Sequence, residues 1–209
     1  YIGEMRQVQP QGPYLVGGFS GGGLIAWEIA RQLEEAGETV AVTVLLDTPL
    51  PMRPVPGRVD KALIKLAMLR EEGPAYLSRW AREKAEWKRA QRNSRAVEDA
   101  HQLHNSAIEA AFYAALPRFD MVRRDGRVVL LRPALDRRFK VSGGRWISAG
   151  MEYVMKDNGL TPLAPALEVI EVPGDHDSMV LEPNVRVLAS HLRRILTQAE
   201  SAPARQAAE

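Results

Sequence analysis

A serine flanked by glycines, in the stretch Gly17–Gly23, limits the folds open to this chain more than any other feature. An apolar run precedes the stretch, and helix-forming residues with apolar side chains at helical spacing follow it. The pattern Gly18-x-Ser20-x-Gly22 therefore stands between a predicted strand and a predicted helix. Nucleophilic serines occupy strained turns in this context, with the hydroxyl exposed at the end of the strand. Because a Cβ on either side should collide with the strand or the helix, we expect both flanking glycines to be required.

A glycine-rich turn before a helix also suits phosphate binding at the helix N-terminus. A dinucleotide fingerprint spaces its glycines as G-x-G-x-x-G and is followed by an acid, and a phosphate loop places a lysine before its serine or threonine. Neither pattern fits, because the loop holds no lysine and Ser20 interrupts the glycines. The nucleophile hypothesis is therefore the stronger of the two.

Four apolar runs predict the strands of one mostly parallel sheet flanked by helices. The run Val40–Leu46 is continuous, as expected for a strand that is buried on both faces. The other runs are 14–16, 127–132 and 167–172. Helices are predicted over 24–36, ended by Gly37, and from Val185 to about residue 198. Strands that alternate with helices indicate an α/β fold.

Three residues with the chemistry of a serine hydrolase follow these strands, in the order Ser20, Asp47, His176. The carboxyl ends of parallel strands lie along one edge of a sheet, so we expect the three side chains to meet there. Histidine activates a serine hydroxyl when a carboxylate fixes its tautomer, and this order of residues is that of the α/β-hydrolases. We predict that the three are catalytic and that the backbone N–H of Gly21 is one oxyanion donor. Asp136, after a later strand, is the alternative acid, but two arginines that could pair with it follow directly.

Residues from about 52 to 125 are predicted to form a helical lid inserted between two strands, because the stretch is longer than an ordinary crossover. Its three helical patterns cover 59–70, 74–95 and 97–116. His101 and His104 lie on one face of the third pattern. Without cysteines or clustered carboxylates beside them, we predict no metal site.

The composition limits the remaining alternatives. A chain of 209 residues is long enough for one sizeable core, so we expect one domain over 1–209 with the lid insertion and a disordered tail at about 201–209. The absence of cysteine excludes disulfides and thiolate metal sites, and with no signal-like start or long apolar run it predicts a cytoplasmic protein without a membrane partner. The net charge of +2 is too small to indicate nucleic-acid binding.

Four segments resemble the type I thioesterase domains that end polyketide and non-ribosomal peptide synthases. They are Gln9-Pro10-x-Gly12-Pro13-Tyr14, Gly18-Phe19-Ser20-Gly21-Gly22, Leu45-Leu46-Asp47 and Pro173-Gly174-Asp175-His176-Asp177-Ser178-Met179. The resemblance extends from about Tyr1 to Leu196, is weak in the lid, and is closer to the polyketide branch. It implies an α/β-hydrolase fold in which Ser20, Asp47 and His176 are catalytic.

The resemblance also implies a substrate and a partner. The serine takes a finished acyl or peptidyl chain from the phosphopantetheine thioester of a carrier protein domain and releases it by hydrolysis or macrocyclisation, with no bound cofactor. Seven basic and two acidic residues between Arg79 and Arg95 give that stretch a charge of +5. Such a stretch is either a solvated helix face or a docking surface for an acidic carrier, for which Arg82, Lys88 and Arg92 are the candidates.

Two departures from the family pattern lead to further expectations. The family fold begins with several strands and with a loop that supplies the second oxyanion donor. We expect both to lie outside this chain, in an N-terminal remainder of the same domain. The stretch 141–165 is longer than the family usually carries. A stand-alone esterase or lipase, and a non-catalytic module that only holds a carrier protein, are the alternative functions.

Overall fold

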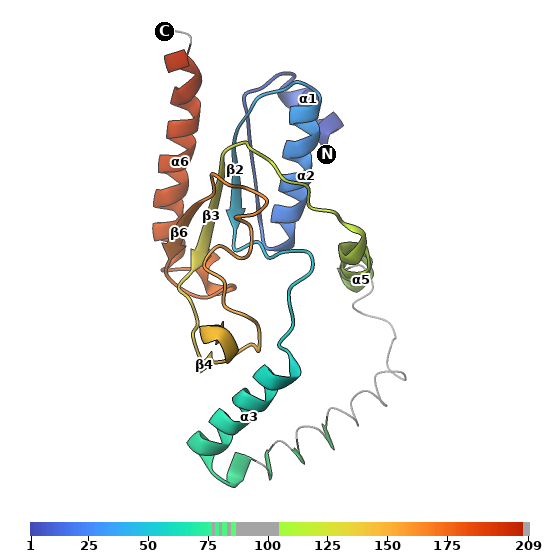
Figure 1. Cartoon of the computed structure of the whole chain (residues 1–209). Coiled ribbons are helices and arrows are strands. Elements are labelled where there is room, and N and C mark those ends of the chain that lie inside the picture. Colours follow the sequence, from blue (N-terminus) through green and yellow to red (C-terminus); the bar gives the residue numbers. More distant parts are fainter. Residues whose placement is uncertain (77, 80, 83–84, 87–104, 207–209) are drawn as a thin grey trace. The chain divides into compact units, whose positions relative to one another are not determined.

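The computed structural model describes residues 1–76, 78–79, 81–82, 85–86 and 105–206 of the chain (Figure 1). The chain divides into two compact units. The first unit holds three segments, Tyr1–Arg53, Phe119–Leu135 and Met155–Glu209. The second unit holds the two segments between them, Pro54–Arg118 and Asp136–Val154.

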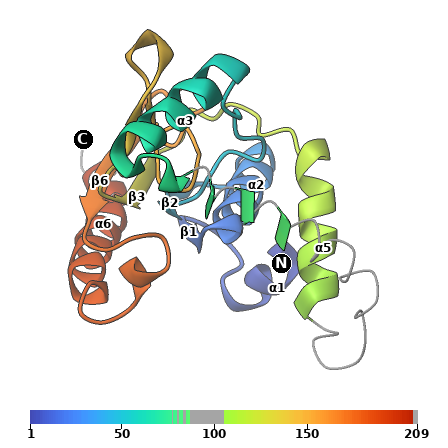
Figure 2. The same cartoon turned by 90° about the horizontal axis from the view of Figure 1, so that it is seen from below.

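Four parallel strands form the sheet of the first unit, in the order β1-β2-β3-β6. They are β1 (Tyr14–Phe19), β2 (Val40–Leu46), β3 (Val128–Pro133) and β6 (Glu168–Val172). Figure 2 shows them side by side in this order. Each of the four apolar runs forms a strand, so the predicted α/β architecture with a parallel sheet is confirmed.

Helices α2 (Gly21–Glu35) and α6 (Val185–Gln206) cover opposite faces of this sheet (Figure 1). Leu33 of α2 is buried in a cluster with residues of β1, and Ile195 of α6 is buried in a cluster with residues of β2 and β3. Gly37 follows α2 with a φ of +81°, a left-handed conformation that glycine adopts without strain. The helix therefore ends where the sequence predicted.

Helix α6 is longer than its apolar pattern predicted. We expected it to end near residue 198, before a disordered tail, but it continues to Gln206. Ala199, Ala202 and Ala204 favour this extension, whereas Pro203, which lies within it, has no N–H to donate to the carbonyl of Ala199. The hydroxyl of Ser201 also donates to the carbonyl of Thr197, one turn earlier. The structure thus extends the helix over residues 201–206 of the predicted tail, while residues 207–209 lie outside the described part.

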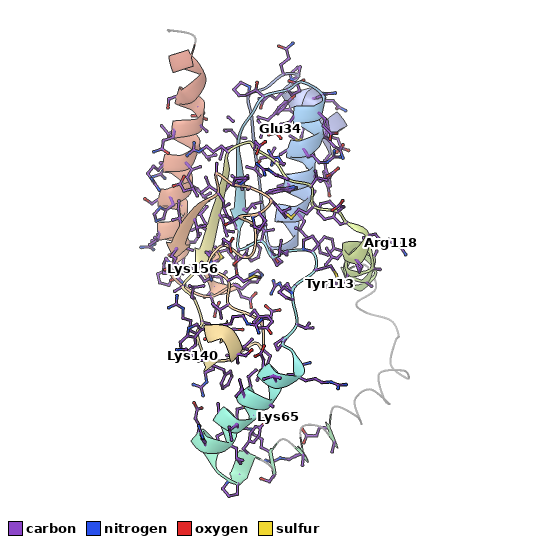
Figure 3. The ribbon with its side chains drawn as sticks, viewed as in Figure 1. Glu34, Lys65, Tyr113, Arg118, Lys140 and Lys156 are labelled. Carbon is purple, nitrogen blue, oxygen red and sulfur yellow. The ribbon has the colours of Figure 1, made fainter. Side chains whose placement is uncertain are left out.

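A buried ion pair fixes α2 in the first unit. Arg124, only 4% exposed, donates to both carboxylate oxygens of Glu34, at 3.0 and 2.6 Å, and to the hydroxyl of Thr43 at 2.9 Å. Figure 3 labels Glu34 on α2. Helix α1 (Ile2–Val8) adds two partly buried side chains to the cluster that includes Leu33. These contacts anchor the helix that begins directly after Ser20.

The second unit combines helices with a short antiparallel sheet. Its elements are α3 (Arg58–Glu72), α5 (Asn105–Ala115), η2 (Leu116–Arg118), β4 (Phe139–Lys140), η3 (Ser142–Gly144) and β5 (Trp146–Ile147). The lid predicted over 52–125 covers only the first segment of this unit. The second predicted helix, 74–95, falls largely outside the described residues, and His101 and His104 fall wholly outside them.

The carboxylate of Asp60 joins the two segments of the second unit. It is buried, and it accepts hydrogen bonds from the backbone N–H and the hydroxyl of Ser142. Its other oxygen accepts from the hydroxyl of Tyr153 and pairs with Arg145 at 2.9 Å. Helix α3 is thus tied to the small sheet. In the part of the chain that the structure describes, no helix is long and apolar enough to cross a membrane.

Candidate active site

Ser20 occupies a sharp turn between β1 and α2. Its φ is 52° and its ψ is −124°, and a positive φ is uncommon for a residue with a side chain. Its backbone N–H donates to the carbonyl of Leu46, the last residue of β2, at 2.8 Å. This bond fixes the turn to the neighbouring strand, so the strained conformation that the sequence predicted for Ser20 is present.

The glycines around Ser20 differ in how closely the structure packs against them. A Cβ on Gly18 would lie 2.2 Å from the carbonyl carbon and oxygen of Gly22, and a Cβ on Gly23 would lie 1.8 Å from the hydroxyl oxygen of Thr48. A Cβ on Gly22 would meet nothing within 4 Å. Our expectation that both flanking glycines are required was therefore right for Gly18 and wrong for Gly22, whose Cα faces open space at the start of α2.

Asp47 follows β2 directly and also has a positive φ, of 43°. Its backbone N–H donates to the carbonyl of Leu131 in β3 at 2.8 Å. Both residues, Ser20 and Asp47, are therefore held by the strand next to the one they follow. Both emerge at the carboxyl ends of the strands, which is where parallel sheets carry their sites.

His176 lies in the loop between β6 and η4 (Ser178–Val180). Asp175 and Ser178 close this loop, since the N–H of each donates to the side chain of the other, at 2.9 and 2.8 Å. The Ser178 hydroxyl and backbone N–H hold the pKa of the Asp175 carboxyl below its ordinary value. The imidazole of His176 stacks on the ring of Phe19, with centroids 4.9 Å apart. The loop and the stacked ring together orient the imidazole.

A line of hydrogen bonds joins the three predicted catalytic residues. Oδ2 of Asp47 lies 2.8 Å from Nδ1 of His176, and Nε2 of His176 lies 3.1 Å from Oγ of Ser20. A carboxylate only accepts hydrogen bonds, so Nδ1 carries the hydrogen and Nε2 is left to accept the serine proton. The side chain of Asp47 is 18% exposed and that of His176 is 38% exposed, so the imidazole is reachable from solvent. The geometry suits a histidine acting as general base towards a serine nucleophile.

The other predicted residues lie as follows. Gly21 is the first residue of α2, and an N–H at that position of a helix has no acceptor within the helix, so it is available to an oxyanion. Asp136, the alternative acid, belongs to the second unit, where its Oδ2 accepts the backbone N–H of Ala149 at 2.7 Å. Arg82 is exposed, and Lys88 and Arg92 lie outside the described residues.

Two polar residues near Asp47 were not predicted. Asn158 donates to Oδ1 of Asp47 at 2.9 Å and to the carbonyl of Thr48 at 3.1 Å. Arg132, at the end of β3, is 7% exposed and donates to the carbonyl of Lys156, which is labelled in Figure 3, at 3.4 Å. Burial lowers the pKa of Arg132, and the charges of Asp47, Glu171 and Asp157 partly offset that effect. The guanidinium stays protonated, as arginines in proteins do.

The Asn158-Gly159 dipeptide, a common turn signal, was the only hint of this contact in the sequence. It predicts a turn, and it does not predict which side chain the asparagine reaches.

No group of three or more histidine, cysteine, aspartate or glutamate side chains that could hold a metal ion occurs among the described residues.

Comparisons with known proteins indicate the family to which this chain belongs. The family described as thioesterase domain matches residues 1–111, which is more than half of the chain. Similar proteins include the non-reducing polyketide synthase PKS1 of Zymoseptoria tritici, 40% identical over 82 residues, and the non-reducing polyketide synthase ustP of Ustilaginoidea virens, 42% identical over 82 residues. Each match covers 38% of this chain, and the chain spans only 4% of either relative.

Two solved structures have a similar fold. A four-domain nonribosomal peptide synthetase, holo-AB3403 bound to AMP and glycine, superposes with a TM-score of 0.58 and 26% identity, over 93% of this chain and 15% of that one. The NocB thioesterase domain, solved as a covalent complex with a fluorophosphonate nocardicin G analogue, gives a TM-score of 0.56 and 24% identity, over 94% of this chain and 72% of that one. The predicted α/β-hydrolase fold is confirmed by these likenesses.

Proposed function

This chain belongs to the thioesterase domain family, and from that premise we propose that it releases a finished acyl chain from the phosphopantetheine thioester of a carrier protein domain through an acyl-enzyme on Ser20. Asp47 and His176 are the other two catalytic residues in this proposal. The carrier is a domain of the same synthase, and no cofactor is bound to the thioesterase itself.

The observation that carries this proposal is the unbroken line of hydrogen bonds from Asp47 through His176 to Ser20. Each of the three residues follows a different strand, and Ser20 has a backbone conformation that costs free energy. Ordinary surface polar residues do not require such backbone strain. A site that holds a strained residue in hydrogen-bonded order with two others is best explained by a chemical role.

Acylation is the first step. Oγ of Ser20 attacks the thioester carbonyl carbon while its proton moves to Nε2 of His176. Asp47 stabilises the imidazolium that forms, and it keeps the Nδ1 hydrogen in place. The backbone N–H of Gly21 donates to the developing oxyanion, and the N-terminal end of α2 adds its dipole. The carbon–sulfur bond then breaks, and the imidazolium gives its proton to the departing phosphopantetheine thiolate.

Release of the chain is the second step. His176 takes a proton from water, or from a hydroxyl or amine of the bound chain, and the oxygen or nitrogen attacks the ester carbonyl of the acyl-enzyme. The bond to Oγ of Ser20 breaks, and the proton returns to the serine. Water gives a free acid, whereas a nucleophile within the chain gives a macrocycle.

We further propose that the chain released is a polyketide. The support is that relatives 40% and 42% identical to part of this chain are called non-reducing polyketide synthases. The similar synthetase structure, at 26% identity, is called a nonribosomal peptide synthetase, so a peptidyl chain is the second substrate to test.

The test is mass spectrometry of the full-length protein mixed with a carrier protein that bears an acyl chain. We expect the acyl mass on the peptide that contains Ser20, followed by a free acid or a macrocycle. Ser20→Ala and His176→Ala should each lower the rate of release by about five or six orders of magnitude. His191→Ala, on α6, is the matched histidine control and should leave the rate unchanged.

Two outcomes would contradict the proposal. Release by Ser20→Ala within about tenfold of the parent rate would exclude Ser20 as the nucleophile. Hydrolysis of free short acyl esters that is faster than hydrolysis of the carrier-bound thioester would favour the stand-alone esterase.

A further inference from the structure

A second side chain holds the carboxylate of Asp47. Oδ2 of Asp47 bonds to His176, and Oδ1 accepts a hydrogen bond of 2.9 Å from Nδ2 of Asn158. We propose that Asn158 is a positioning residue, which keeps Asp47 aimed at His176 during the proton transfers to and from Ser20. This inference rests on the proposed function and adds to it a residue outside the Ser20-Asp47-His176 set.

The orientation of the Asn158 amide follows from its partners. Nδ2 lies 2.9 Å from Oδ1 of Asp47 and 3.1 Å from the carbonyl oxygen of Thr48. Both partners only accept hydrogen bonds, so the atom that faces them is the NH2 group and not the amide oxygen. One NH2 group has two hydrogens, and each acceptor therefore has its own donor.

These two bonds fix both the side chain of Asp47 and the backbone that follows it. A carboxylate bound through one oxygen can rotate about its terminal torsion, which has broad minima. A second donor on the other oxygen removes this freedom. The bond to Thr48 also stabilises the chain directly after Asp47, which has a φ of 43°, so the asparagine supports the backbone of this turn as well as the carboxylate.

The loop that carries Asn158 has its own internal support. Asn158 has a φ of 50°, a left-handed conformation that asparagine and aspartate adopt more readily than most residues. Oδ1 of the preceding Asp157 accepts the N–H of Gly159 at 2.9 Å, and its Oδ2 accepts the N–H of Thr161 at 3.0 Å. Arg132 donates to the carbonyl of Lys156 on the other side. The amide is thus presented to Asp47 by a loop whose shape does not depend on Asp47.

The charged groups near Asp47 also influence how the labelling of Ser20 depends on pH. The charge of Arg132 acts on Asp47, on Asp157 in the loop, and on Glu171 of β6. Asp175 and Asp177 flank His176 in sequence. All of them are unchanged when Asn158 alone is replaced. A shift that appears only in Asn158 variants is therefore a property of the contact with Asp47.

The experiment measures how fast a fluorophosphonate labels Ser20 of the full-length protein as a function of pH. Labelling requires neutral His176 as the base, so the labelling rate falls on the acid side, where the imidazole becomes protonated. Asn158→Ala removes the donor and should slow labelling tenfold to about a hundredfold at the optimum, the scale of one hydrogen bond to a charged group.

Asn158→Asp keeps the shape of the side chain and its left-handed backbone but places negative charge against Asp47. Two carboxylates this close share a proton at low pH, and once that proton leaves, the added negative charge favours the imidazolium, so the acid limb of labelling moves to higher pH than in the parent. Asp157→Asn is the matched control. It removes the acceptor for Thr161 in the same loop without touching Asp47, and it should lower the melting temperature without moving the acid limb upward.

Three outcomes separate this inference from the proposed function. Slower labelling of Asn158→Ala together with the upward shift of Asn158→Asp supports the positioning role. Parent rates and an unmoved acid limb in both variants would overturn it, as would variants that only lose thermal stability in the manner of Asp157→Asn. Failure of the parent protein to be labelled at Ser20 would refute the proposed function, and the inference with it.

Discussion

Replacing Gly18 by alanine should disable the turn that holds Ser20, while the same change at Gly22 should be harmless. The Cβ of Gly18→Ala would lie 2.2 Å from backbone atoms of Gly22, whereas real Cβ contacts are essentially never below 3.0 Å. The strand and the helix must therefore separate by close to an ångström. Overpacking of this kind costs about 1–3 kcal/mol. We expect the upper end, because the obstructing atoms are backbone and cannot rotate away.

The consequence for activity is larger than that for stability. A loss of about 3 kcal/mol lowers the melting temperature by about 6–12 °C in a chain of this size. A displacement of the nucleophile by about 1 Å can cost a hundredfold in rate. Gly22→Ala adds a methyl group to open space at the second residue of α2, and alanine loses less backbone entropy than glycine on folding, so its melting temperature should stay or rise.

The assay compares thermal unfolding and the rate of fluorophosphonate labelling for the two variants and the parent protein. Labelling should fall by about a hundredfold for Gly18→Ala and remain at the parent rate for Gly22→Ala. If Gly18→Ala keeps both the melting temperature and the labelling rate of the parent, then the close approach of Gly18 to Gly22 does not set the turn, and the reasoning is refuted.

Three further predictions concern the acid, the second unit and the carrier. Asp47→Asn should slow labelling of Ser20 by about 10⁴-fold, and Asp136→Asn should not slow it. The reverse result would show that Asp136, and not Asp47, is the acid that orients His176. The Ser142 and Tyr153 hydroxyls hold the pKa of Asp60 below its ordinary value. An aspartate in the unfolded chain has a pKa of about 4, so Asp60 stabilises the fold completely above about pH 4, and this stabilisation is lost as the pH falls further. Asp60→Asn should therefore flatten the fall in melting temperature below about pH 4, and an unchanged slope would contradict this. Charge reversal to glutamate in the basic stretch should lower kcat/KM for a carrier-bound substrate more than for a small pantetheine thioester, and equal effects would leave a solvated helix face. The reversed residues are Arg82, Lys88 and Arg92.

The sheet could be predicted because its strands are simple patterns. A strand buried on both faces, such as Val40–Leu46, must be apolar throughout, and few other structures produce such a run. Sites lie at the carboxyl ends of parallel strands, and this rule predicted that Ser20, Asp47 and His176 lie together. In the structure His176 is within hydrogen-bond distance of both Asp47 and Ser20. Their catalytic roles remain predictions.

The features that were missed depend on contacts distant in sequence or on very short elements. Asn158 lies 111 residues from Asp47, and a polar residue in a loop gives no periodic signal. Strands β4 and β5 have two residues each, too few for alternation to be visible. The difference between Gly18 and Gly22 could not be predicted either, because it depends on how the helix packs on the strand and not on the local pattern.

The two units are interleaved along the chain, and this limits how the domain can be recombined. The polypeptide passes between them near residues 53, 118, 135 and 154, so each unit is built from separate pieces of sequence. A chimera that grafts only Pro54–Arg118 from a homologue would leave Asp60 of the donor facing Ser142 and Tyr153 of the host. A buried carboxylate with foreign partners is destabilising. Exchange of the second unit between such domains should therefore succeed only when Asp136–Val154 is transferred together with Pro54–Arg118, which requires four junctions.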